Sequence, residues 1–393
     1  MPILNRDRIK IYSRTILATY IITIAVLLIF RSDLLDPMGK PIGTDFLAHY
    51  AGSRLALQGE AAAAYEYSRL REVEAEVLGR APPPLYWLYP PSYFLFILPL
   101  ALLPYIGAWV GWMLVTGAGY VAVAKHTFAD RLTLPLTLAF PATIQNFVQG
   151  QNGFLSAFFF GGGLLIISKR PLVGGIVLGA MSYKPHLAVL LPIALIACRL
   201  WMAFAGFLLG VLGLVTVSTI FFGSDTWLVY FQNIMFAGQV LQTGGAPLFK
   251  APTTFALVSL LGADLTTARI AQSVVSVASL VVVVWLWSRR AASFSLKAAG
   301  LVIGSLLFTP SCYDYDLVLV AIAIAWLALH MRGNGHNSYE DWALVIAWAS
   351  PLALPIIAAA TNVQLGPMVF VLLFCIIVQR ALRELRPRTM TLA

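Results

Sequence analysis

Charged residues are scarce in this sequence of 393 residues. Asp, Glu, Lys and Arg together make up 11% of it, whereas 60% of the residues are hydrophobic. Soluble domains carry roughly a quarter charged residues, so this balance excludes an ordinary soluble protein and indicates a chain that crosses a membrane many times. The 22 prolines and 30 glycines are typical of packed membrane helices that bend and approach one another closely.

Cysteine is scarce as well, and no local cysteine pair exists. Cys198, Cys312 and Cys375 lie far apart without a C-x-x-C spacing, so a disulfide framework and a structural zinc site are both disfavoured. The chain also lacks a glycine-rich loop between a strand and a helix, the usual cradle of a nucleotide phosphate. The glycines at 161–163 and 174–175 instead indicate close contacts between helices.

No small-residue cleavage site follows the first apolar run, 15–30, so we interpret that run as an uncleaved membrane helix. Apolar runs recur along the rest of the chain, although several are shorter than the ~20 residues of a perpendicular crossing. They predict an all-α integral membrane protein, a polytopic bundle of about twelve transmembrane helices in a single domain, 1–393. The run 92–124 is too long for one crossing, and we expect Pro99 and Pro104 to break it.

Lysine and arginine concentrate in the termini and in alternate connecting segments, such as 125–131 and 289–297. This asymmetry predicts that both termini are cytoplasmic. The net charge of +9 then reflects topology and gives no indication of nucleic-acid binding. Every polar cluster that interrupts the apolar pattern is predicted to lie outside, namely the loop 31–91 and the segments 149–153, 183–186, 223–250 and 312–316.

The first outer loop, 31–91, has the pattern of two short helices, at 46–58 and 67–79. In the first, Asp45 and His49 share one face with the small residues that follow at helical spacing. The second has Leu70, Val73 and Val77 on one side, and we expect it to rest on the protein or on lipid headgroups.

The second outer loop, 223–250, carries Trp227, Tyr230 and Phe231 at a spacing that suits an interfacial helix. Such a helix would flank an access route for a lipid. A simple connector at the membrane edge is the alternative interpretation.

Three features in this order resemble the GT87 family of glycosyltransferases: an acidic residue in the first outer loop, "YPPSYFLFILPLALLP" (89–104), and the segment 150–201, which begins "GQNGFLSAFFFGGG" and contains "SYKPH". These are membrane enzymes of the GT-C superfamily, similar to the polyprenol-phosphate-mannose-dependent mannosyltransferases of actinobacteria. The resemblance covers roughly residues 40–240.

The resemblance implies a GT-C-type bundle in the cytoplasmic membrane, a polyprenyl-phosphate sugar donor, and a glycan or glycolipid acceptor at the outer face. Mannose is the first candidate for the sugar, and arabinofuranose is among the alternatives. It also implies that the acid of the first outer loop, here Asp45, is the catalytic base. The family tends to have a histidine or another polar cluster at an outer helix end in its later half. This chain has "PSCYDYD" (310–316) there, without a histidine, so no histidine role is carried over.

Inverting transfer from a lipid phosphate needs a base for the acceptor hydroxyl, donors for the departing phosphate and an apolar groove for the prenyl tail. Asp45 is the predicted base; the alternative is that it caps the helix that follows it. His49, one turn further on, would orient Asp45 or contact substrate, or serve a structural role. The two residues alone are too few for a convincing metal site.

Lys184 and His186 flank a proline between two apolar runs, where an uncompensated lysine is costly. We predict that both bind the donor phosphate. The alternative is that Lys184 extends along the helix end and places its ammonium group in water.

Neutral hydrogen-bonding groups complete the predicted site. Those expected to bind substrate are Tyr89, Gln149, Gln151 and Asn152, with loop capping as the alternative. Tyr313 and Asp314 would bind acceptor hydroxyls or a divalent cation, and their alternative role is to cap the following helix. A divalent cation is the one cofactor that the sequence suggests. Because Asp314 and Asp316 are two residues apart, we expect only one of them to reach the centre.

The competing hypothesis is a secondary transporter or a flippase for lipid-linked sugars. Transporters place polar residues near the bilayer midplane, often on broken helices in two repeated halves. No clear internal repeat is visible here, and the polar clusters are predicted to lie at one face.

Overall fold

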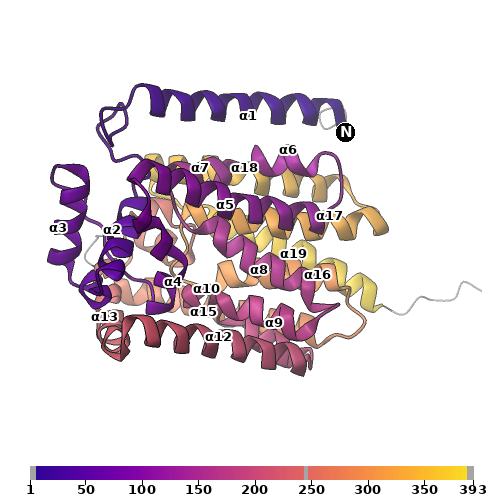
Figure 1. The fold of residues 1–393 in the computed structure, drawn as a ribbon. Coiled ribbons are helices and arrows are strands. Elements are labelled where there is room, and N and C mark those ends of the chain that lie inside the picture. Colours follow the sequence, from indigo (N-terminus) through magenta and orange to yellow (C-terminus); the bar gives the residue numbers. More distant parts are fainter. Residues whose placement is uncertain (1–5, 243–246, 387–393) are drawn as a thin grey trace, which may run out of the picture.

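The computed structural model describes residues 6–242 and 247–386, and these residues fold into helices joined by short connections (Figure 1). Within these ranges no strand forms, and the extended contacts are isolated bridges that join Ser32, Leu35 and Pro41. The all-α prediction is therefore confirmed.

In the first half of the chain, the α-helices are α1 (Arg6–Ile29), α2 (Phe46–Leu57), α3 (Tyr67–Leu78), α4 (Phe94–Ile97), α5 (Tyr105–Thr127), α6 (Thr133–Leu138), α7 (Pro141–Gln149), α8 (Gly153–Ile167), α9 (Pro171–Gly179), α10 (Pro185–Ala188) and α11 (Leu190–Ala197). In the second half, they are α12 (Trp201–Phe222), α13 (Ser224–Gln242), α14 (Thr254–Leu260), α15 (Leu265–Ser288), α16 (Phe294–Phe308), α17 (Val318–Asn334), α18 (Ser338–Thr361) and α19 (Gly366–Leu385). Short 3₁₀ helices are η1 (Ala61–Tyr65), η2 (Pro91–Tyr93), η3 (Leu98–Leu102), η4 (Ala180–Tyr183), η5 (Leu248–Lys250) and η6 (Asp314–Leu317).

Six helices of the described ranges are long and apolar enough to cross a membrane: α1, α5, α12, α15, the continuous η6–α17 and α18. Five further apolar helices are shorter, so the protein is a polytopic membrane protein but the count of twelve crossings is not confirmed. The reason is visible in α16, which has only 15 residues, 12 of them buried by neighbouring helices. A helix enclosed by protein need not match the bilayer thickness.

Proline and glycine act as the sequence predicts. The long run 92–124 is interrupted at Leu103 and Pro104, and α5 begins directly after Pro104. The helices α9 and α12 touch backbone to backbone, because a Cβ at Gly175 would collide with Ala203 and one at Gly206 with Leu172. Such contacts bring helices together inside a membrane, where no hydrophobic force drives their association.

Both helices predicted in the first outer loop form, as α2 and α3. The side of α3 that carries Leu70 and Val73 is buried, so this helix rests on the protein. In the second outer loop, Trp227 on α13 donates to Ser218, and the Tyr230 ring packs against Tyr65 of the first loop. Residues 243–246 of that loop lie outside the described residues.

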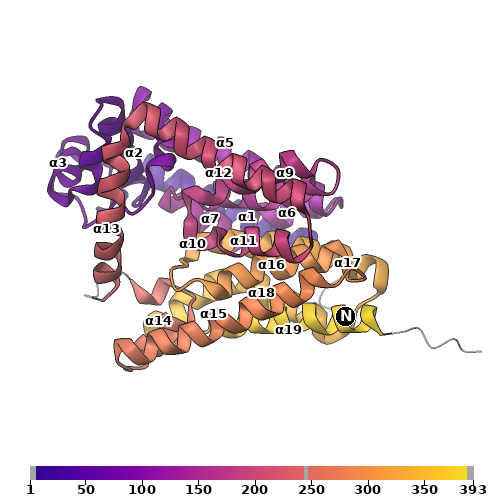
Figure 2. The same cartoon turned by 90° about the horizontal axis from the view of Figure 1, so that it is seen from below.

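The molecule has two distinct ends. Figures 1 and 2 both place α2, α3 and α13 at one end, whereas the N-terminus and the end of α19 emerge at the other. At the latter end, Asp130 lies in the connection between α5 and α6. It pairs with Arg6 at the start of α1 and with Arg332 near the end of α17. The segments predicted to be rich in cations therefore meet at one end, and the polar clusters described next meet at the other.

Candidate active site

Asp45 occupies the N-cap position of α2, yet its side chain makes no capping hydrogen bond. Its Oδ2 instead accepts a hydrogen bond of 3.0 Å from Gln151 Nε2, and its backbone N–H donates to the carbonyl of Gln149 at 3.1 Å. Helix capping therefore does not explain this acid. Its Oδ1 has no hydrogen-bond donor among the described residues and is the free oxygen of the carboxylate.

The turn between α7 and α8 brings Gln149 and Gln151 to Asp45. Gly150 has φ +70°, a backbone conformation that favours glycine, and a Cβ there would collide with Phe46 and Trp109. The tight turn closes the end of α7 against the start of α2, so the side chain of Gln151 and the backbone carbonyl of Gln149 both reach Asp45.

Gln151 connects Asp45 to an aromatic cluster. Its Oε1 accepts from Tyr89 Oη at 3.3 Å and lies 3.4 Å from His49 Nε2. Burial is the main cause that lowers the pKa of His49 to about 3; the hydrogen bond to Gln151 opposes this shift, and the nearby charge of Lys184 contributes to it. The imidazole is therefore neutral, donates from Nε2 and leaves its buried Nδ1 without a partner.

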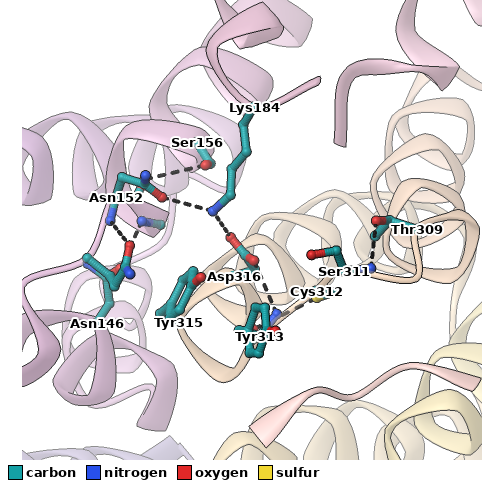
Figure 3. Close-up of polar contacts among 12 residues, drawn as sticks. Asn146, Asn152, Ser156, Lys184, Thr309, Ser311, Cys312, Tyr313, Tyr315 and Asp316 are labelled. Carbon is teal, nitrogen blue, oxygen red and sulfur yellow. Dashed lines mark hydrogen bonds and ion pairs between the residues drawn. The ribbon is translucent and has the colours of Figure 1, made fainter. Parts of the chain in front are cut away.

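Lys184 joins the polar turn to the later half of the chain. Figure 3 shows its Nζ between Asn152 Oδ1, at 2.8 Å, and Asp316 Oδ1, at 2.5 Å. Only 2% of the Lys184 side chain and 0% of the Asp316 side chain are exposed. This lysine therefore does not extend into water, and its charge is compensated inside the protein.

The segment 312–316 packs against the start of α8 because Gly153 has no side chain; a Cβ there would overlap the carbonyl oxygen of Tyr315. Asp314 Oδ2 accepts from Gln149 Nε2 at 3.2 Å, while Asp316 Oδ2 caps η6 by accepting from the Tyr313 N–H at 3.2 Å. Both acids thus join the network, from different sides, whereas the sequence predicted only one.

Asp45 binds its proton more tightly than an exposed aspartate does. Desolvation by burial raises the pKa of Asp45 above its ordinary value, and the hydrogen bond from Gln151 and the positive charge of Lys250 oppose this rise. A carboxylate with a raised pKa is a stronger base than an exposed one.

Lys250, in η5, is a residue that sequence reasoning missed. It interacts electrostatically with both Asp45 and Asp314, and it has no hydrogen bond or ion pair with any described side chain. Gln364 fixes the adjacent backbone by donating to the Phe249 carbonyl at 2.9 Å. The available signal was that Lys250 is the sole cation of the segment 223–250.

Two predicted residues stand apart from this hydrogen-bonded network. His186 lies close enough to interact with the Lys184 charge, but its buried Nε2 has no partner. Tyr313 contributes its backbone N–H, and its ring stacks on Tyr315. The network therefore unites eight predicted side chains with the unpredicted Asp316; the eight are Asp45, His49, Tyr89, Gln149, Gln151, Asn152, Lys184 and Asp314.

In the described ranges, no group of three or more His, Cys, Asp or Glu side chains is placed to hold a metal ion. Glutamine NH₂ groups, which are donors, face Asp45 and Asp314. Two cavities stand out in the described chain, and neither is lined by residues of this network. The two glutamine side chains thus pair with the two carboxylates.

Comparison with known proteins gives one match. No curated protein and no solved structure matches this chain. The model of glycosyltransferase family 87 matches residues 87–310, more than half of the sequence. That range includes Tyr89, the turn 149–152 and Lys184, and it begins after Asp45 and ends before Asp314. The chain therefore belongs to glycosyltransferase family 87.

Proposed function

We propose that the protein is an inverting glycosyltransferase that moves mannose from a polyprenyl phosphate to a glycan or glycolipid acceptor. The observation that carries this proposal is the junction at Gln151 and Asn152. Gln151 donates a hydrogen bond to Asp45, and the neighbouring Asn152 accepts one from Lys184. Adjacent residues of one turn thus hold an acid and a cation, an arrangement that suits attack on a carbon that bears a phosphate.

Asp45 is the proposed base. Its free Oδ1 accepts the proton of the acceptor hydroxyl while the hydroxyl oxygen attacks the anomeric carbon of the donor. The bond between that carbon and the phosphate oxygen breaks on the opposite side, which inverts the configuration and releases polyprenyl phosphate. Gln151 and the neutral His49 fix the position of the carboxylate without neutralising its charge.

The departing phosphate needs positive charge or hydrogen-bond donors. We propose Lys250 as a cation for this role, because no described side chain compensates it. Lys184 contacts the phosphate when it exchanges Asp316 for the ligand, with His186 as a second donor. Sugar and acceptor hydroxyls are then bound by the neutral groups of the network, Tyr89, Gln149 and Asn152, and by Tyr313 and Asp314.

We place the site at the outer face of the cytoplasmic membrane, with both termini in the cytoplasm. The support is the separation of charge along the molecule. Lysine and arginine concentrate at the end that carries Arg6 and Arg332, as the positive-inside rule requires of the cytoplasmic side. The network lies at the other end, where η6 precedes α17. A midplane site, which a transporter would need, is not favoured by this arrangement.

The test is transfer of labelled sugar from a panel of polyprenyl-phosphate sugars by the purified chain in nanodiscs. Asp45→Asn should lower transfer by roughly 10²–10⁴-fold, the usual contribution of a general base. Asp225→Asn, at an exposed acid of the second outer loop, is the matched control and should retain activity. Unchanged transfer by a folded Asp45→Asn protein would remove Asp45 as the base. Movement of the lipid-linked sugar across proteoliposomes without transfer would favour a flippase.

A further inference from the structure

A polar cavity of about 680 Å³ lies at the end of the molecule opposite the candidate active site. It opens where α17 and α19 end and α18 begins. Since α17 has 17 residues, about 25 Å separates this cavity from the network at the other end of the same helix. Its lining includes three arginines and one glutamate: Arg380, Arg383, Arg386 and Glu384.

The floor of the cavity is fixed. Arg380 is bound by both oxygens of Glu340, at 3.0 and 2.6 Å, and by the carbonyl of Gly335 at 2.8 Å. Only 5% of the Arg380 side chain is exposed. Because this pair is bidentate and neutral overall, it supplies a rigid base. Of the remaining charged side chains in the lining, the two cations Arg383 and Arg386 outnumber the one acid, Glu384.

The rim provides the available positive charge. Arg383 is about half exposed, at 53%, and its contacts with Glu340 at 3.7 Å and Tyr339 Oη at 3.3 Å are long. Arg386 is exposed and has no ion pair within the described ranges. The exposed Arg290 lies beside Ala291, which also lines the cavity. The planar guanidinium groups of Arg383 and Arg386 are suited to the geometry of a phosphate.

The histidine in the cavity does not indicate catalysis. His330 Nδ1 lies 3.1 Å from Ser293 Oγ and 3.6 Å from Glu384 Oε1. A serine nucleophile needs the two ring nitrogens to serve different partners, one for the hydroxyl and one for the acid. Here the same nitrogen faces both, so the cavity is suited to binding.

Aromatic and apolar side chains place the cavity at the level of lipid headgroups. Tyr339 and Trp342, in the first turns of α18, are 46% and 43% exposed, as is typical of residues at a membrane–water interface. Further along the same helix, Ile346 is 48% exposed and faces the surroundings. A molecule with an anionic head in the cavity could lay its acyl chains on this surface.

We propose that this cavity binds the phosphorylated headgroup of an anionic phospholipid in the leaflet opposite the candidate active site. Arg383 and Arg386 bind the phosphate, and the apolar surface of α18 beside them accepts the acyl chains. Basic pockets between membrane helices recognise anionic headgroups through the same combination of charge and interface depth.

The test compares the full chain with the variant Arg383→Gln/Arg386→Gln in phosphatidylcholine nanodiscs that contain increasing phosphatidylglycerol. Native mass spectrometry measures the bound phosphatidylglycerol, and thermal unfolding measures the stabilisation it gives. Loss of two cations near the headgroup should weaken binding about thirtyfold. Both arginines are exposed, so the variant should fold, and equal unfolding temperatures in pure phosphatidylcholine check this.

Lys125→Gln/Arg131→Gln is the matched control, because both residues are exposed cations near Asp130, at the same end but outside the cavity. It should keep the affinity of the original chain. Equal weakening in both variants would show a diffuse charge effect and overturn the proposal. Inorganic phosphate forms a separate arm: binding that requires Arg383 and Arg386, without any binding of phosphatidylglycerol, would assign the cavity to a free anion and also overturn it.

Discussion

Each end of the molecule buries one ion pair, and the two differ in their surroundings. At the end with both termini, Arg380 and Glu340 satisfy each other through two hydrogen bonds. At the candidate active site, Lys184 and Asp316 share one, and residues that interact with Lys184 have buried atoms without partners, among them His49 Nδ1, Asn152 Nδ2 and His186 Nε2. A buried polar group without a partner costs roughly 1–3 kcal/mol. The first pair thus stabilises the fold, whereas the second lies in an environment that a polar ligand would complete.

The largest expected effect comes from removing one cation at either end. Lys184→Met and Arg380→Met each leave a buried carboxylate without its partner, which should destabilise the protein by roughly 3–5 kcal/mol. Thermal unfolding in nanodiscs measures the loss. Similar stability to the original chain in either variant would contradict the assignment of that pair as buried and structural.

Double variants then separate the two ends. Lys184→Met/Asp316→Leu and Arg380→Met/Glu340→Leu should both regain most of the lost stability, since each replaces an ion pair by apolar groups. Sugar transfer should return only in Arg380→Met/Glu340→Leu. Full transfer in the first would show that Lys184 and Asp316 act in folding alone.

Replacing either of two buried glutamates by glutamine should change the stability of the protein, and the two changes should have opposite signs. Glu74 and Glu340 are both 0% exposed, but Glu74 has no hydrogen-bond partner and Glu340 has Arg380. Burial raises the pKa of Glu74 from 4.5 to about 8, against a weaker effect of Arg71. The unfolded chain therefore loses this proton first, and stability falls as the pH rises from about 4.5 to about 8.

Glu74→Gln removes that penalty and should stabilise the protein by roughly 2–4 kcal/mol at pH 8 and by little at pH 4. Glu340→Gln leaves Arg380 buried without a counter-charge and should destabilise it by roughly 3 kcal/mol. Unfolding temperatures at the two pH values give both results. Destabilisation by Glu74→Gln at pH 8 would mean that the carboxylate has a partner that the structure does not show.

The sequence sufficed to predict what depends on local pattern. The helices α2 and α3 follow from apolar periodicity, and the break before α5 follows from Pro104. The gathering of Asp45, Gln151 and Lys184 could be expected because charge asymmetry assigns all three to one face of the membrane. That argument assigns residues to a face, but not to partners within it.

The partners depend on packing between distant segments. Lys184 and Asp316 are 132 positions apart, and they meet because Gly153 lets the segment 312–316 approach the start of α8. Nothing in the local sequence of either residue encodes this contact. The count of crossings is not confirmed for a related reason: α16 is apolar and enclosed by protein, and apolarity alone does not distinguish that environment from lipid.

A smaller effect is expected from the cation without a partner. Lys250→Gln should raise the KM for the polyprenyl-phosphate donor about tenfold and leave the unfolding temperature unchanged, because Lys250 has no ion pair among the described residues. Lys40→Gln, at an exposed lysine of the first outer loop, is the matched control and should change neither value. A fall in stability without a change in KM would assign Lys250 to the fold.

The smallest effect is a shift in the pH dependence of transfer. Burial raises the pKa of Asp45, and this acid must be ionised to accept a proton, so the acid limb of kcat/KM should lie above the ordinary aspartate value of 3.8. Lys250 favours the ionised form, so Lys250→Gln should move the limb to still higher pH, while Lys40→Gln should not move it. Rates measured across the acid range with saturating acceptor give the limb. A limb that stays in place in Lys250→Gln would separate Lys250 from Asp45, and the comparison of the two ends would then rest on Lys184 alone.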